Sequence, residues 1–120
     1  MKTFLEIRES KLGSLIDKAH KQQQLHTRGG QASGNASKHH HAALDSFASA
    51  KQAHKNGNHK AAKQLAHNAV AHSLHTSVWD GFKKGVGDEH HNKLAKHIGM
   101  GDLNKSNNSD KHMKHAKDMI

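Results

Sequence analysis

The stretch KQAHKNGNHKAAKQLAHNAV, residues 51–70, contains the turn that decides the fold. Asn56-Gly57 can end a helix, because glycine readily adopts the left-handed backbone that follows a helix C-terminus. Asn58 can cap the next helix by accepting a hydrogen bond from a backbone amide of its first turn. Two helices joined by so short a turn should lie antiparallel, so the sequence predicts an αα-hairpin.

Alanine and larger apolar residues recur at helical spacing on both sides of this turn. The first helix is predicted to start after a Ser37 cap and to run to about Lys55. The small residues resemble a tetratricopeptide-type hairpin, but such repeats need neighbouring copies and only one is present. A generic hairpin is therefore favoured. The large apolar residues expected in the core of the hairpin and of the chain after it are Leu44, Phe47, Leu65, Val70, Leu74, Val78, Trp79, Phe82, Leu94 and Ile98.

The rest of the chain also reads as helical, because proline is absent and alanine is abundant. Residues 3–22 predict an amphipathic helix, and the glutamine- and glycine-rich residues 22–37 predict a flexible linker. A short helix is expected over 89–98, closed by Gly99, and a basic helix over 111–120.

The predicted fold class is thus all-α, a small domain built on an antiparallel αα-hairpin. The organisation expected is a leader at 1–9, a helix and flexible linker at 10–37, a helical domain at 38–98 and a loosely ordered basic tail at 99–120. Apolar residues make up 32% of the 120-residue chain, so the core should be thin. No apolar run approaches the ~20 residues of a membrane span, so no membrane contact is predicted.

The formal net charge of +9, with fifteen histidines besides, favours a polyanion partner. Lysine dominates over arginine, which favours diffuse neutralisation of phosphates over bidentate reading of bases. The alternative is a basic surface that only keeps the protein soluble. The prediction is salt-sensitive, sequence-tolerant contact with the DNA phosphate backbone, through Lys51, Lys55, Lys60, Lys63, Lys83, Lys84, Lys93 and Lys96.

The histidines raise the alternative of a metal-binding module. His72 and His75 lie three residues apart on the second predicted helix and are weak candidates for ligands. Structural zinc usually has four ligands and catalytic zinc three, and no HExxH pattern occurs. Cysteine is absent, which removes thiolate sites. No cofactor is predicted, and histidine is expected to serve mainly as a weakly basic surface residue.

Catalysis is not predicted. No nucleophile elbow and no phosphate-binding glycine loop occurs between residues 38 and 98. The carboxylates in this range are Asp45, Asp80, Asp88 and Glu89.

The first residues, Met1-Lys2-Thr3-Phe4, then Glu6 and Ile7-Arg8-Glu9, resemble the capsid-targeting leader of internal head proteins from T-even-like bacteriophages. In that family the leader ends in Ile-x-Glu, and the maturation protease cuts after the glutamate. The resemblance implies recognition of Ile7 and Glu9, with cleavage before Ser10. Compared with the leader expected in that family, this sequence has one residue fewer between the aromatic residue and Ile-x-Glu. An ordinary helix start, capped by Thr3 and Glu6, remains the alternative.

The resemblance further implies a protein packaged with DNA in the phage head and then delivered to the host cytoplasm. Its partners would be the phage prohead, the maturation protease, the DNA phosphate backbone and a host protein target, since some members inhibit host defence enzymes. Two alternatives remain open. One is a nucleoid-type protein that binds DNA without specificity, and the other is the histidine-based metal module.

Overall fold

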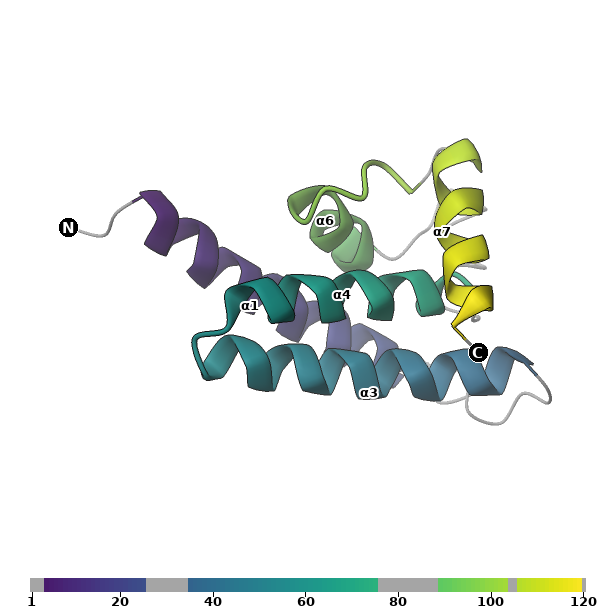
Figure 1. Cartoon of the computed structure of the whole chain (residues 1–120), viewed down its shortest axis with the longest axis horizontal. Helices are drawn as coiled ribbons and strands as arrows, with labels where there is room; N and C mark the ends of the chain where they lie inside the picture. Colours follow the sequence, from purple (N-terminus) through teal and green to yellow (C-terminus); the bar gives the residue numbers. More distant parts are fainter. Residues whose placement is uncertain (1–3, 26–34, 76–88, 104–105, 120) are drawn as a thin grey trace.

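The computed structural model describes residues 4–25, 35–75, 89–103 and 106–119. Within these ranges every regular element is a helix, which confirms the predicted all-α class (Figure 1). The helices are α1 (Phe4–Leu25), α3 (Asn35–Lys55), α4 (His59–Ser73), α6 (Glu89–His97) and α7 (Ser106–Asp118).

The predicted hairpin is confirmed, with α3 and α4 side by side and antiparallel (Figure 1). Gly57 has a φ of 82°, the left-handed backbone that the turn requires. The side-chain oxygen of Asn58 accepts a hydrogen bond of 3.2 Å from the amide of Ala61, as expected for an N-cap. Helix α3 begins at Asn35, slightly before the predicted cap at Ser37.

Alanine forms the contact between the two hairpin helices. Among the described residues, Phe47 is the largest side chain that is completely buried, whereas Leu44 and Leu65 are only half-buried. The predicted core residues Val78, Trp79 and Phe82 lie outside the described residues. Small side chains let the two backbones approach closely but bury little apolar area. The completely buried alanines of the hairpin are Ala43, Ala50, Ala62, Ala66, Ala69 and Ala71.

Helix α1 supplies bulk that the hairpin lacks. It packs against α3 and α6 and buries Leu12, Leu15, Ile16 and Ala19. The sequence placed this helix outside the 38–98 domain, but the structure makes it part of the same core. At Gly13 the helices come so close that an added Cβ would lie 2.6 Å from Cε1 of His54.

Helix α6 contacts both α1 and α4 and buries Leu94 and Ala95. Its end matches the prediction, because Gly99 has a φ of 87°. Helix α7 contacts α4 and starts at Ser106, earlier than the predicted residue 111. In Figure 1, α6 and α7 lie on the same side of the hairpin, with α7 crossing near the C-terminal end of α4.

Gly101 joins α6 to α7 in a conformation that other residues adopt only with strain, with a φ of 81°. A Cβ there would lie 2.7 Å from Nδ2 of Asn108, which donates hydrogen bonds to the carbonyls of Met100 (2.6 Å) and Asp102 (3.2 Å). We expect Gly101→Ala to lower the free energy of unfolding by about 2–3 kcal/mol, from backbone strain and a displaced amide.

The matched control is Gly57→Ala. Gly57 also has a positive φ, but nothing lies within 4 Å of an added Cβ. For Gly57→Ala the free energy of unfolding should therefore fall only by the backbone contribution, about 1–2 kcal/mol. Urea denaturation of both variants checks the difference, and equal losses would contradict the role assigned to Asn108.

Candidate nucleic-acid interface and histidine cluster

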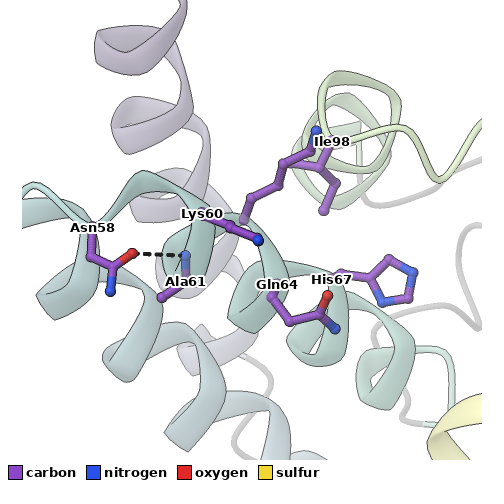
Figure 2. A pocket seen from close by; sticks show the side chains of 7 residues that line it. Asn58, Lys60, Ala61, Gln64, His67 and Ile98 are labelled. Atoms are coloured by element: carbon purple, nitrogen blue, oxygen red, sulfur yellow. Dashed lines mark hydrogen bonds between the residues drawn. The ribbon is translucent and has the colours of Figure 1, made fainter.

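Exposed lysines of α4 line a groove between α4 and the end of α6. The groove has a volume of about 620 Å³ and includes Lys60, Lys63 and His67 on α4, with Ile98 just after α6. Figure 2 shows Lys60, Gln64 and His67 on α4, with Ile98 coming from the neighbouring segment. Lys60 and Lys63 were both predicted from the sequence, and the structure brings them together in this groove.

A second groove of about 410 Å³ runs between α1 and α6. Lys93 and Lys96 of α6 line it, joined by His97 and by Lys11 of α1. Sequence reasoning missed Lys11, because no motif links a lysine in the first helix to a helix 80 residues later. Among these lysines, Lys93 makes an exposed ion pair with Glu89, at 3.8 Å.

The two lysine grooves are defined by Lys60 and Lys63 in the first and by Lys11, Lys93 and Lys96 in the second. The first reaches Ile98 just after α6, and the second is lined by residues of α6 itself. Leu15 and Ile98 are buried residues that line the grooves, whereas the five groove lysines are exposed. Ammonium groups on an open surface can neutralise phosphates of an extended polyanion. No arginine occurs in either groove to read a base edge bidentately.

The other predicted lysines lie elsewhere. Lys51 pairs with Asp17 at 3.0 Å, so part of its charge is already balanced. Hydrogen bonds from Lys51 and then Lys21 lower the pKa of Asp17, which keeps that carboxylate ionised. Lys55 is exposed at the end of α3 and lines neither groove. Lys83 and Lys84 lie outside the described residues.

The residues of the leader resemblance fall at the start of α1. The bond between Glu9 and Ser10 lies within the helix, and the side chains of Ile7 and Glu9 are outside the described set. Ser10 is exposed, and Leu12 is the first buried side chain that the structure describes in α1. The start of this helix projects beyond the rest of the molecule (Figure 1).

Six histidines form a cluster where α3, α4 and α7 meet: His39, His67, His72, His75, His112 and His115. At its α3 side, Nδ1 of His39 lies 3.0 Å from Nδ1 of His72, so one ring donates and the other accepts. The ring of His39 also stacks on that of His75, with centroids 4.1 Å apart and planes 16° apart.

The α7 side of the histidine cluster is built around His67. Its ring makes edge contacts with His112 and His115, at centroid distances of 5.2 and 5.5 Å. Nε2 of His75 donates to the carbonyl of Met113 at 2.7 Å, and Nε2 of His112 donates to the carbonyl of Met100 at 3.1 Å. Imidazole rings thus connect α7 to α4 and to the segment before α7.

The expectation of surface histidines was wrong for several of them, since His39, His40, His72, His91 and His112 are buried. A neutral imidazole fills the volume of a medium-sized side chain and can satisfy one donor and one acceptor. Nδ1 of His40 accepts a hydrogen bond from Nε2 of Gln23 at 2.7 Å, and Nε2 of His91 donates to Oε1 of Gln23 at 3.2 Å. These rings fill space that a chain with few large apolar residues leaves open.

Burial favours the neutral form of three rings of the histidine cluster. It lowers the pKa of His39 to about 4, with the neighbouring His75 and His72 adding to the effect. Burial also lowers the pKa of His67 and of His72, and neighbouring histidines reinforce both shifts. At pH 7 the rings of His39, His67 and His72 therefore add polar contacts but little charge.

The predicted weak metal pair is part of this cluster. His72 and His75 bond to His39 and to the Met113 carbonyl respectively. No group of three or more histidine, cysteine, aspartate or glutamate side chains in the described ranges could hold a metal ion.

No helix in the described ranges is long and apolar enough to cross a membrane. No family model, curated protein or solved structure matches the chain.

Proposed function

We propose that this protein binds DNA through the phosphate backbone, with the two lysine grooves as the contact surface. The observation that carries the proposal is the grouping of lysines from α1, α4 and α6 in two grooves, one between α1 and α6 and one between α4 and the segment just after α6. Ammonium groups on open surfaces attract phosphates without distinguishing bases. The chain acts as a binding protein in this proposal, with no catalytic role.

The proposal extends to a bacteriophage virion protein that is packaged with DNA in the head and injected with the genome. Residues 1–9 would act as the leader, recognised during prohead assembly and removed by the maturation protease. The resemblance around Ile7 and Glu9 supports this, as does the position of Leu12, because a cut before Ser10 leaves the described core contacts of α1 in place. In the host cytoplasm the protein would then meet a host target, such as a defence enzyme.

Binding to duplex DNA should fall steeply with salt. If the five groove lysines each neutralise one phosphate, log K plotted against log salt should have a slope of about −4.5, and affinity should fall roughly 10²–10³-fold between 50 and 200 mM salt. Fluorescence anisotropy with two duplexes of unrelated sequence measures both quantities. Absence of binding at ~50 mM salt would refute the proposal, and a tenfold preference for one sequence would contradict the phosphate-only mode.

The leader is tested separately, by the intact mass and N-terminal residue of the protein from its native source. A chain that begins at Ser10 inside purified virions is the expected result. A chain that begins at Met1 or Lys2 would leave the nucleoid-type alternative in its place. A stoichiometric zinc ion that survives dialysis and raises the melting temperature would favour the metal module.

A further inference from the structure

We propose that α7 is an acid-released helix, which the histidine cluster holds on α4 at neutral pH and frees when the cluster takes up protons. This inference does not depend on DNA binding, because both the device and its test lie within the protein. It assigns a regulatory role to the histidine cluster, of which only His67 also lines a lysine groove.

Apolar contacts hold α7 only weakly. Ala116 is its one completely buried apolar side chain among the described residues, and Met113 is half-buried. Alanine contributes little on burial because its side chain is a single methyl group. Asn108 and His112 bind α7 to the segment before it, through the carbonyls of Met100 and Asp102. The polar links from α7 toward α4 come from histidines: His75 donates to the Met113 carbonyl, and the ring of His67 contacts His112 and His115.

Protonation would turn these contacts into repulsion. The ring centroid of His67 lies 5.2 Å from that of His112 and 5.5 Å from that of His115, where like charges disfavour one another. The contact between Nδ1 of His39 and Nδ1 of His72 needs one nitrogen without a proton, so it is lost when both rings are charged.

The groups that face the cluster do not offset this charge. On α7, Lys111 acts on His67 in the same direction as the histidines and opposes its protonation. Of the carboxylates on the surrounding elements, Asp102 accepts from Asn92, whereas Asp45 on α3 and Asp110 and Asp118 on α7 are exposed. None of them appears among the groups that set the pKa of His39, His67 or His72.

The sign of the linkage follows from these shifts. Burial lowers the pKa of His67 and His72 in the docked state, so these rings bind protons more tightly once they are exposed. Release should therefore begin as the pH falls below about 6.5, the ordinary histidine pKa. The contact between α3 and α4 is made largely of alanines, which do not titrate, so the hairpin should persist after α7 has detached.

Energy transfer between two dyes can follow the release, and the chain has no cysteine to interfere with labelling. A Lys63→Cys/Lys117→Cys pair reports the distance from α4 to α7, and a Ser49→Cys/Lys63→Cys pair reports the hairpin. All three positions are exposed. Between pH 7.5 and 5, transfer in the first pair should fall while transfer in the second stays constant.

A double variant tests which histidines take up the protons that release α7. His67→Phe/His115→Phe keeps aromatic rings at two positions of the cluster but cannot charge them, so release should move to lower pH by roughly half a unit or more. His41→Gln, at an exposed position on α3, is the control and should leave the midpoint unchanged.

Three results would overturn the proposal. The first is constant transfer in the α4–α7 pair down to pH 5. The second is a simultaneous change in both pairs, which would mean that the whole domain unfolds. The third is an unshifted midpoint in the phenylalanine variant. The first two use the wild-type histidines, so they decide the matter even where the phenylalanine variant folds poorly.

Discussion

Replacing Lys11, Lys93 and Lys96 together by glutamine should weaken binding to duplex DNA roughly 10²–10³-fold at ~50 mM salt. These lysines line the groove between α1 and α6, and each is exposed. Each phosphate contact contributes about −0.9 to the slope of log K against log salt, so the slope should become shallower by about 2.7. Glutamine preserves most of the stem length and polarity of lysine, which restricts the change largely to charge.

The matched control replaces Lys18, Lys21 and Lys38 by glutamine. This variant has the same net charge as the groove variant, and its three positions are exposed but line neither groove. It should keep most of the affinity and slope of the wild type. Equal losses in the two variants would mean that overall charge, and not the grooves, attracts the DNA. Anisotropy titrations at four or more salt concentrations separate the two cases.

Acid should destabilise the folded protein strongly. The pKa of His39 is about 4 in the fold and near 6.5 for an exposed ring, so the fold favours the neutral form. Its stabilising contribution is complete above pH 6.5 and is lost as the pH falls toward 4. At pH 5 this single group should cost on the order of 2 kcal/mol of the free energy of unfolding. Burial lowers the pKa of His67 and His72 as well, and these rings add to the loss.

Urea denaturation at pH 7.5 and pH 5 checks this result. His39→Gln should be less stable at pH 7.5, because its contacts with His72 and His75 are altered, but it should lose about 2 kcal/mol less on acidification. The same substitution at exposed His41 should leave the pH dependence close to that of the wild type. A pH dependence in His39→Gln equal to that of the wild type would contradict the assignment.

Local features of the fold could be predicted because they depend on short-range backbone chemistry. The turn at Asn56-Gly57, the cap at Asn58 and the end of α6 at Gly99 were all predicted, and each has the expected geometry. A positive φ or a capping bond involves neighbours in sequence, and the residue types at those positions are enough to predict it.

The tertiary arrangement could not be predicted in the same way. Helix α1 carries an apolar face, but nothing in its sequence says that this face packs against α3 and α6. The same packing brings Lys11 beside Lys93 and Lys96, which completes the second lysine groove. The members of the predicted lysine set that share a groove could be separated from Lys51 and Lys55 only once the helices had been placed.

The histidines were misjudged for a physical reason. Composition scales treat histidine as a polar surface residue, and fifteen of them in a basic chain suggest a charged exterior. The fold buries five of the histidines that the structure describes, because a buried ring can find a polar partner inside the core. His40 and His91, for example, both form hydrogen bonds with the side chain of Gln23. Pairing of this kind depends on distance in space and leaves no periodic signal in the sequence.

The packing of α1 against α6 also sets an order of events during synthesis. A ribosome delivers α1 first, but one of the surfaces that covers it belongs to residues 89–97, made much later. A nascent chain that has completed α3 and α4 can already pair them, because their contacts are close in sequence. The apolar face of α1 must wait, partly exposed, until α6 emerges. The groove that holds Lys11 and Lys93 therefore forms in the same late step that closes this part of the core.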